Sequence, residues 1–354
     1  MIKADQTYLT EKLKPLRDVV PGKATALPDG ILVDGNGLFA DNFEIGIATT
    51  IETDNKDKFF LPAKAIDFIA SLPPGQIKIK NSERTVTVEH AAGKSRFASA
   101  DPELFVFANP FDIMPQSEYS IRADEFAKKL DLVTYASDPN SMNAIARGVY
   151  LEGDGSELYI VAMDGVKMAV SSIPYDVEIQ SIIPTKAIRK MLSLKLVGDI
   201  QLAFANDRVV LRNADYTISV KRIMKDYPKF QTFISREPTI MISTNARELY
   251  DAANRAIICS NSMQALIKLQ RTPAAPDRLT ITTLSALSEY SADVRITGDA
   301  SDEIQIAVNA KELVNALKTF GDEQIKIDYK SEKDFLLIYG PKSIAIILPV
   351  RIKV

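Results

Sequence analysis

Several residue types that support common chemistries are nearly missing from this sequence of 354 residues. One cysteine, Cys259, excludes an intrachain disulfide and a cysteine-rich zinc site. One histidine, His90, excludes any mechanism that needs two. No apolar run approaches the length of about 18 residues that spans a membrane, and the first residues do not resemble a signal peptide. We therefore expect a soluble, cytoplasmic protein that does not bind membranes.

Nucleotide-binding and metal-binding motifs are also missing. There is no G-x-x-x-x-G-K-S/T loop and no G-x-G-x-x-G motif after a strand. The segments 34–37 and 153–155 are rich in glycine and aspartate, but they fit tight turns and lack the spacing of a calcium loop. The many carboxylates would allow a hydrolase in principle, yet their spacing singles out no pair. We predict no catalytic residue, no cofactor and no metal.

The composition is that of a globular protein with more than one domain. Apolar residues make up 46% of the chain and charged residues 25%, and the net charge is -3. A chain of this length is too long for one ordinary core, so we expect two or three domains. The net charge excludes a uniformly basic nucleic-acid binder, but it does not exclude a locally basic face.

The sequence contains three copies of one unit. Residues 60–72, 182–194 and 307–319 each run from apolar residues through Pro or Asn to a shared lysine and then a helical apolar pattern. Pro62 and Pro184 suit a first helical turn, and Asn309 suits an N-cap. The shared lysines are spaced by 122 and 125 positions, and they are Lys64, Lys186 and Lys311.

An earlier helix in each unit gives nearly the same period. We predict these helices over residues 8–20, 123–137 and 245–260. Their matching apolar residues are spaced by 117 and 123 positions, and they are Leu9, Phe126 and Leu249. A period this long indicates a triplicated domain rather than a solenoid repeat.

Proline-containing joints place the domain boundaries, and the segments between the helices alternate as β-strands do. The joints at 109–115 and 235–238 predict domains at 1–117, 118–237 and 238–354. Asp164-Gly165 between two apolar strands predicts a β-hairpin. Each domain should then be two helices packed on antiparallel sheets, which is an α+β architecture.

The predicted helices carry a surplus of positive charge on their outward faces. Spacing at about 100° per residue assigns ten cations and five anions to these faces, a surplus of five. The whole chain carries -3, so the remaining residues carry -8. The outward cations are Lys14, Lys64, Lys128, Lys186, Arg189, Lys190, Arg247, Arg255, Lys311 and Lys318.

Two interpretations of this charge remain open. Solvated helix faces often carry lysine and arginine for solubility alone. A bias that recurs in all three repeats also fits contact with nucleic acid. Because no aromatic residues are interleaved with the cations, they suit phosphate contact better than base stacking. Such contact is independent of base sequence and sensitive to salt.

Five segments, in this order on a triplicated frame, resemble one known family. They are 13–16, 22–28, 147–170, 220–230 and 346–351. The family is the bacterial DNA sliding clamp, the beta subunit of the replicative DNA polymerase, and the resemblance covers the whole chain. It implies a ring made by a head-to-tail homodimer that encircles double-stranded DNA with its helices inward. It also implies a DNA polymerase, an ATP-dependent clamp loader and other clamp-binding-motif proteins as partners.

The resemblance also implies a partner-peptide groove between the second and third domains. For single members such as Ile346 and Ile347, ordinary strand packing is the alternative. Lys23 takes the place of a basic loop residue of the family, which implies a DNA contact. The groove residues carried over by motif are Met163, Gly165, Val166, Lys167, Met168, Pro228, Thr232, Phe233, Ile346, Ile347, Leu348, Pro349, Val350 and Arg351.

The chain departs from the family's pattern at the groove. Val166-Lys167 replaces His-Arg, Tyr227-Pro-Lys-Phe230 replaces Phe-Pro-Asp-Tyr, and Lys353 and Val354 extend the tail. These departures predict an altered partner motif. The function expected is that of a non-catalytic processivity factor. The alternatives are an interaction scaffold of the same fold that does not encircle DNA, and a hydrolase that uses buried carboxylates.

Overall fold

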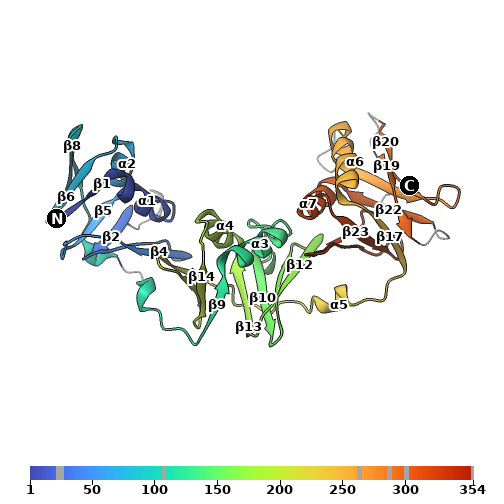
Figure 1. The fold of residues 1–354 in the computed structure, drawn as a ribbon, viewed down its shortest axis with the longest axis horizontal. Coiled ribbons are helices and arrows are strands. Elements are labelled where there is room, and N and C mark those ends of the chain that lie inside the picture. Colours follow the sequence, from blue (N-terminus) through green and yellow to red (C-terminus); the bar gives the residue numbers. More distant parts are fainter. Residues whose placement is uncertain (21–27, 106–108, 261–264, 285–288, 299–302, 352–354) are drawn as a thin grey trace. The chain divides into compact units, whose positions relative to one another are not determined.

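The computed structural model describes the chain except for residues 21–27, 106–108, 261–264, 285–288, 299–302 and 352–354. The described residues form two compact units (Figure 1). The first unit contains residues 1–125 and 189–222, and the second contains residues 126–188 and 223–354.

The three sequence repeats fold into the same succession of strands and helices, except that the third has one extra short strand, β21. The first contains β1 (Ile2–Asp5), α1 (Gln6–Arg17), β2 (Gly30–Asp34), β3 (Gly37–Asp41), β4 (Ile45–Thr50), β5 (Lys58–Pro62), α2 (Ala63–Ser71), β6 (Gln76–Ser82), β7 (Thr85–His90) and β8 (Gly93–Ala98). The second contains β9 (Ser117–Arg122), α3 (Ala123–Thr134), β10 (Gly148–Asp154), β11 (Glu157–Met163), β12 (Lys167–Pro174), β13 (Glu178–Pro184), α4 (Thr185–Ser193), β14 (Asp199–Phe204), β15 (Arg208–Arg212) and β16 (Tyr216–Lys221). The third contains β17 (Ile240–Asn245), α6 (Ala246–Cys259), β18 (Leu266–Arg271), β19 (Arg278–Thr283), β20 (Ser291–Arg295), β21 (Thr297–Gly298), β22 (Ile304–Asn309), α7 (Ala310–Phe320), β23 (Gln324–Tyr329), β24 (Leu336–Tyr339) and β25 (Ile344–Ile347). A short helix, α5 (Gln231–Ile234), lies in the segment that joins the second and third repeats.

The sequence landmarks occupy equivalent structural positions. The three shared lysines are each the second residue of a helix, in α2, α4 and α7. Leu9, Phe126 and Leu249 are each the fourth residue of the earlier helix, and their exposed fractions are 1%, 2% and 0%. These positions confirm the predicted repeat and all six predicted helices.

Local capping explains where several helices begin. The Asn309 side chain accepts a hydrogen bond from the Lys311 backbone N–H, as predicted for an N-cap, and Asp5 and Asn245 cap α1 and α6 in the same way. The placement of Pro62 and Pro184 inside a first helical turn was wrong by one residue. Both end a strand, and the helix begins at the next residue. Proline lacks an N–H, so it fits equally well just before the helix.

The sheets follow one pattern in all three repeats. Each repeat contributes two blocks of four strands, and in the third repeat the short strand β21 adds a fifth strand to one block. In the first unit, β1-β6-β7-β8 form a separate sheet, and β5-β2-β3-β4 continue through β16-β15-β14-β9. In the second unit, β13-β10-β11-β12 continue through β25-β24-β23-β17-β21, and β20-β19-β18-β22 form a separate sheet. The continuous sheets form where β4 pairs antiparallel with β16 and β12 with β25.

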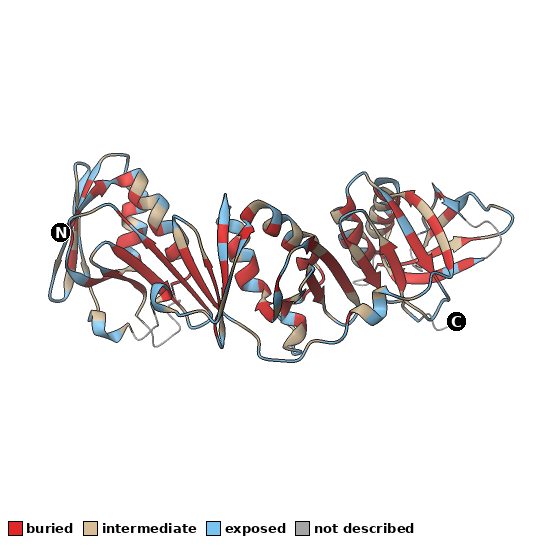
Figure 2. Ribbon diagram, turned by 60° about the horizontal axis from the view of Figure 1, so that its bottom comes forward, coloured by how far each residue is buried: buried red, intermediate tan, exposed pale blue. Residues whose placement is uncertain are grey.

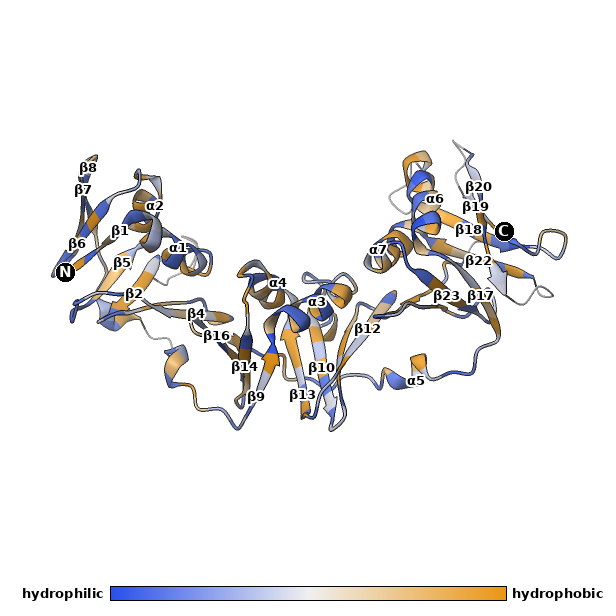
Figure 3. Ribbon diagram, in the orientation of Figure 1, coloured by the Kyte–Doolittle hydropathy of each residue, from blue (hydrophilic) through white to orange (hydrophobic). Residues whose placement is uncertain are grey.

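Amphipathic helices cover one side of the sheets within each unit. Figure 1 shows α1 beside α2 in the first unit and α6 beside α7 in the second. In α7 the buried residues include Leu313, Ala316, Leu317 and Phe320, which recur at helical spacing. Figure 2 shows buried residues along the strands and along one side of the helices, and Figure 3 shows hydrophilic and hydrophobic stretches on the same helices. The α+β layer architecture predicted from the sequence is confirmed.

The predicted hairpin around Asp164-Gly165 is also confirmed. β11 and β12 pair antiparallel with Met163 opposite Met168, and Gly165 has a φ of 97°, which favours glycine. The domain boundaries at 1–117, 118–237 and 238–354 stay a prediction, because the two compact units divide the middle repeat between them.

Candidate functional site

The structure places the predicted helical cations on exposed positions with one exception. All of those described are exposed except Lys190. Because these residues lie opposite the buried stripe of each helix, they face solvent and are accessible to an anionic partner. Lys23 lies outside the described residues.

Some of these cations have partners within the protein. Lys190 Nζ lies 2.8 Å from a carboxylate oxygen of Asp18, and its side chain is only 12% exposed. Arg247 Nε lies 3.2 Å from Asp251, in an exposed pair of the kind that contributes little to stability. The Arg255 guanidinium donates to the Tyr290 hydroxyl. Lys190 therefore has a structural role in joining α4 to α1, which the sequence did not predict.

The hairpin turn between β11 and β12 brings several predicted groove residues to the C-terminal strand. Met168 lies opposite Ile346, and Lys167 lies opposite Ile347. Beyond β25, the Leu348 backbone N–H donates to the Val166 carbonyl at 2.9 Å. The tail of the third repeat therefore runs directly beside the hairpin turn of the second.

A buried apolar cluster lies behind this contact. Met168, Ile346, Phe230 and Leu337 belong to it, with exposed fractions from 0% to 4%. Phe230 comes from the joining segment before α5, so that segment packs onto the sheet. Ile346, and likewise Ile347 at 1% exposed, is therefore a strand-packing residue.

Two stacked tyrosines extend the same cluster. The Tyr150 and Tyr227 rings lie 4.3 Å apart and nearly parallel. Burial raises the pKa of Tyr150 to about 12, with a smaller contribution from the carboxylate of Glu152. Burial also raises the pKa of Tyr227. Both rings stay neutral at physiological pH and act as apolar packing surfaces with a polar tip.

Other predicted groove residues are exposed and apolar. Val166 is 51% exposed, Leu348 is 44% exposed and Phe233 is 37% exposed. Pro228 and Thr232 are exposed on the joining segment. Because Val166 and Leu348 share a backbone hydrogen bond, their side chains form a small apolar surface over a rigid base. This surface is suitable for an apolar side chain of a partner peptide.

Lys167 points into an ion-pair network, although the sequence placed it on the groove wall. Its Nζ lies 2.6 Å from Asp164 and 2.7 Å from Glu312 at the start of α7, and its side chain is 10% exposed. Burial opposes its charge, but the two carboxylates outweigh that effect and raise the pKa of the ammonium. Lys167 thus connects the hairpin turn to the third repeat.

We expect the substitution Lys167→Met to destabilise the protein. It leaves the Asp164 and Glu312 carboxylates close together without a cation, and we expect a loss of about 3 kcal/mol in the free energy of unfolding. Urea denaturation measures this change. The control is Lys225→Met, at an exposed lysine of the same unit. Equal unfolding midpoints for the two variants would show that the network does not stabilise this contact.

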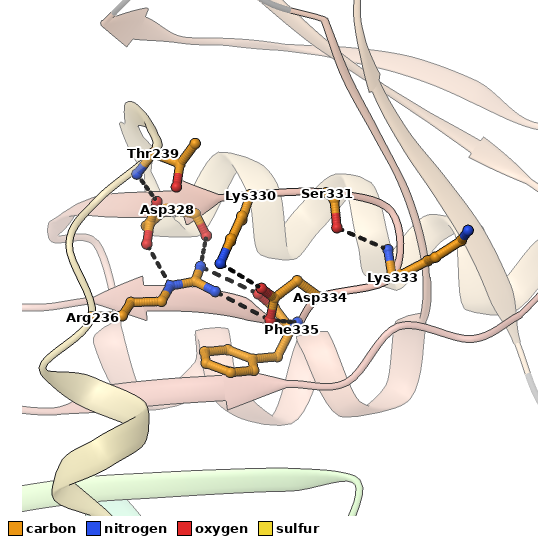
Figure 4. Close-up of polar contacts among 8 residues, drawn as sticks. All are labelled: Arg236, Thr239, Asp328, Lys330, Ser331, Lys333, Asp334 and Phe335. Atoms are coloured by element: carbon orange, nitrogen blue, oxygen red, sulfur yellow. Dashed lines mark hydrogen bonds and ion pairs between the residues drawn. The ribbon is translucent and has the colours of Figure 1, made fainter.

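A second buried ion pair, not predicted from the sequence, anchors the segment that follows α5 (Figure 4). Arg236 Nε donates to Asp328 at 2.8 Å, and the Asp328 side chain is fully buried. The guanidinium also lies over the Phe335 ring, at 4.4 Å from the centroid, and contacts Asp334 at 3.3 Å. Phe335 in turn contacts Phe233 edge to face. Arg236 therefore fixes the position of one exposed aromatic residue of the predicted groove.

The end of the tail leaves the hairpin and follows another strand. The Val350 backbone N–H donates to the Ala307 carbonyl of β22 at 2.8 Å. Val350 and Arg351 line a cavity of about 600 Å³ together with residues of β18 and β22. These two predicted groove residues therefore lie against β22 and this cavity.

The described part of the chain contains neither a candidate metal site nor a helix that could cross a membrane. No group of three or more His, Cys, Asp or Glu side chains there could hold a metal ion. Within the same residues, no helix is both long enough and apolar enough to cross a membrane.

Comparison with protein families and curated proteins gives one consistent result. Residues 120–229 match the model of the DNA polymerase III beta subunit, central domain. The beta sliding clamp of Haemophilus influenzae is 23% identical over 80% of this chain and 78% of its own length. The beta sliding clamp of Escherichia coli K12 is 20% identical over 82% of this chain and 80% of its own.

Solved structures show the same fold along the whole chain. The DNA polymerase III subunit beta of Pseudomonas aeruginosa superposes with a TM-score of 0.91 at 20% identity, over 99% of this chain and 100% of the other. The beta subunit of Thermotoga maritima gives a TM-score of 0.88 at 17% identity, over 100% of both chains. With the family model, the curated relatives and the fold in agreement, the chain belongs to the bacterial DNA polymerase III beta subunit family, the beta sliding clamps.

Proposed function

We propose that the chain is a DNA polymerase processivity factor. In this proposal it forms a ring around double-stranded DNA and tethers the replicative polymerase and other DNA-processing proteins. It is a non-catalytic subunit, and a separate ATP-dependent loader opens the ring. The observation that carries the proposal is the recurrence of exposed cations on the helices of all three repeats, in a chain of net charge -3.

The cations support contact with the phosphate backbone. They lie on helices rather than loops, and the repeat places one exposed lysine at the second position of α2, α4 and α7. A protein that neutralises phosphates in this way binds without base specificity and releases counterions. Such contact lets a ring move along DNA.

The pairing of edge strands between successive repeats supports a head-to-tail homodimer. Within the chain, β4 pairs with β16 of the next repeat and β12 pairs with β25 of the next. The corresponding edge strand of the third repeat is β20, and that of the first is β8, and both end their sheets. Pairing of β20 in one chain with β8 in another would extend this pattern, and two such contacts would close a dimer.

The exposed apolar surface at Val166 and Leu348 supports the tether. A partner held there stays near the DNA, so its effective concentration at the template rises and it rebinds before it diffuses away. The Val166-Lys167 departure also changes this surface. Val166 makes it apolar, while the charge of Lys167 is neutralised by Asp164 and Glu312.

Replacing the three shared lysines with glutamine should weaken DNA binding and its dependence on salt. The slope of log K against log salt concentration is negative, and each lost phosphate contact makes it about 0.9 less negative. The slope of the triple variant should therefore be about 2 to 3 less negative per chain. Anisotropy titrations of labelled linear duplex at several salt concentrations measure the slope. The matched control replaces Lys56, Lys225 and Lys326, which are exposed and lie outside the helices. If both triple variants lose the same slope, the helical cations serve solubility.

A further inference from the structure

A cavity beside the C-terminal tail contains two of the predicted groove residues, Val350 and Arg351, but the rest of its lining belongs neither to the predicted groove nor to the proposed DNA contacts. Its volume is about 600 Å³, within the range of sites that hold small ligands or a few peptide residues. Its walls come from β18, β22, the loop after β23, and the tail at Val350 and Arg351. All of them belong to the second unit.

Strand alternation places this cavity on the face of its sheet that points away from the helices. Ile267 and Leu269 of β18 are buried in the core that also contains residues of α6 and α7. Lys268 lies between them, so its side chain points to the opposite face, beside its cross-strand neighbour Ala307. The cations of α6 and α7 therefore belong to a different surface.

The cavity combines an apolar floor with a cationic rim. Ala307, Val350 and Leu284 supply aliphatic surface. The rim carries Lys268, Lys333 and Arg351 against one carboxylate, that of Glu332. Figure 4 shows Lys333 at the far end of its loop from the Arg236 ion pairs, with its ammonium pointing away from them. In the region that the structure describes, none of the three cations makes an ion pair with an acidic side chain.

We propose that this cavity binds an acidic segment of a partner protein. Carboxylates of the segment would contact Lys268, Lys333 and Arg351, and an apolar side chain between them would lie on the aliphatic floor. Such charge-assisted contacts are stronger than neutral hydrogen bonds. The described lining contains no aromatic side chain, so it offers no platform for stacking nucleic-acid bases. A protein segment is the better fit for that reason.

The site extends partner recognition beyond the predicted groove, and it does not depend on a closed ring or on DNA. A partner that occupies both surfaces would gain avidity from the second contact. Peptide binding is measured on the protein without DNA. A failure to bind the peptide therefore leaves the processivity proposal unchanged, and binding of the peptide does not support the processivity proposal.

The test uses a fluorescein-labelled peptide of sequence Asp-Glu-Leu-Asp-Glu and anisotropy titration of the full chain. We expect saturable binding that weakens with salt, and at least about tenfold weaker binding to Lys268→Gln/Lys333→Gln. The control, Lys225→Gln/Lys326→Gln, removes the same charge from exposed positions elsewhere in the unit and should bind as the parent does. The neutral peptide Asn-Gln-Leu-Asn-Gln should bind at least about tenfold more weakly than the acidic one.

Three results would overturn the proposal. One is the absence of saturable binding of the acidic peptide. Another is equal weakening in both double variants, which would indicate diffuse attraction to the unit. The third is displacement of the peptide by a single-stranded oligonucleotide that binds more tightly and also requires Lys268 and Lys333, which would make the cavity a nucleic-acid site. Circular dichroism of each variant checks that the fold is retained.

Discussion

The substitutions Val166→Ala and Leu348→Ala together should abolish the proposed stimulation of a DNA polymerase and leave the proposed homodimer intact. Both side chains are about half exposed, and a backbone hydrogen bond holds them together. Truncation removes the apolar contact surface offered to a partner and disturbs little of the core. A few side chains carry most of the binding energy of an interface, and each buried methylene group contributes about 0.8 kcal/mol, so the loss of both side chains should cost at least about tenfold in affinity. Primer extension with and without the protein measures the effect.

The choice of residues follows from burial. Met168 also belongs to the predicted groove, but it is only 4% exposed and packs in the buried cluster. Truncating it to alanine would cost about 2 to 5 kcal/mol of stability and confuse binding with unfolding. Val166 and Leu348 avoid that problem.

The matched control is Met142→Ala with Val197→Ala. These side chains are 100% and 76% exposed, so their removal takes away comparable apolar surface outside the predicted groove. The control should stimulate the polymerase as the parent does, and sedimentation should give a dimer for both variants. Full stimulation by the Val166/Leu348 variant would show that the partner binds elsewhere.

The sequence predicted the helices and the repeat well, because both depend on local patterns. Apolar residues at helical spacing place Leu9, Phe126 and Leu249 on buried faces, and the shared lysines mark the same helical position three times. The Asp164-Gly165 hairpin could be predicted equally well from the sequence, since its turn needs glycine at a positive φ. These features need only neighbours along the chain.

The pairing of strands that are far apart in the chain could not be predicted from the sequence in the same way. Nothing in the local pattern shows that β4 pairs with β16 or that β12 pairs with β25. The buried pair of Arg236 and Asp328 joins residues 92 positions apart. Single-sequence patterns report how residues alternate, but not which strand lies beside which.

The candidate site shows the same difference between features that local sequence predicts and features that depend on long-range contacts. Motif resemblance identified the hairpin and the tail, and the structure brings Val166 and Leu348 together. The motif resemblance could not show that Lys167 points toward Glu312, because that contact requires α7 to lie beside the hairpin. Nor could the resemblance show that Val350 and Arg351 line a cavity together with residues of β18 and β22. Side-chain direction depends on the neighbouring element, which only the folded chain defines.

The second large expected effect concerns how long the protein stays on circular DNA compared with linear DNA. If two chains close a ring around DNA, the protein cannot leave a circle without opening, whereas it can slide off the end of a linear molecule. A scaffold of the same fold that binds only through surface charge would dissociate from circles and from linear DNA at similar rates. Its attachment would also be lost on raising the salt concentration.

The most direct measurement is retention on nicked circular duplex after loading by an ATP-dependent loader. Gel filtration at raised salt concentration separates bound from free protein, before and after a restriction enzyme cuts the circle once. We predict that the protein stays on the intact circle through the column and is lost when the circle is cut. Equal loss from intact and cut DNA would contradict the ring.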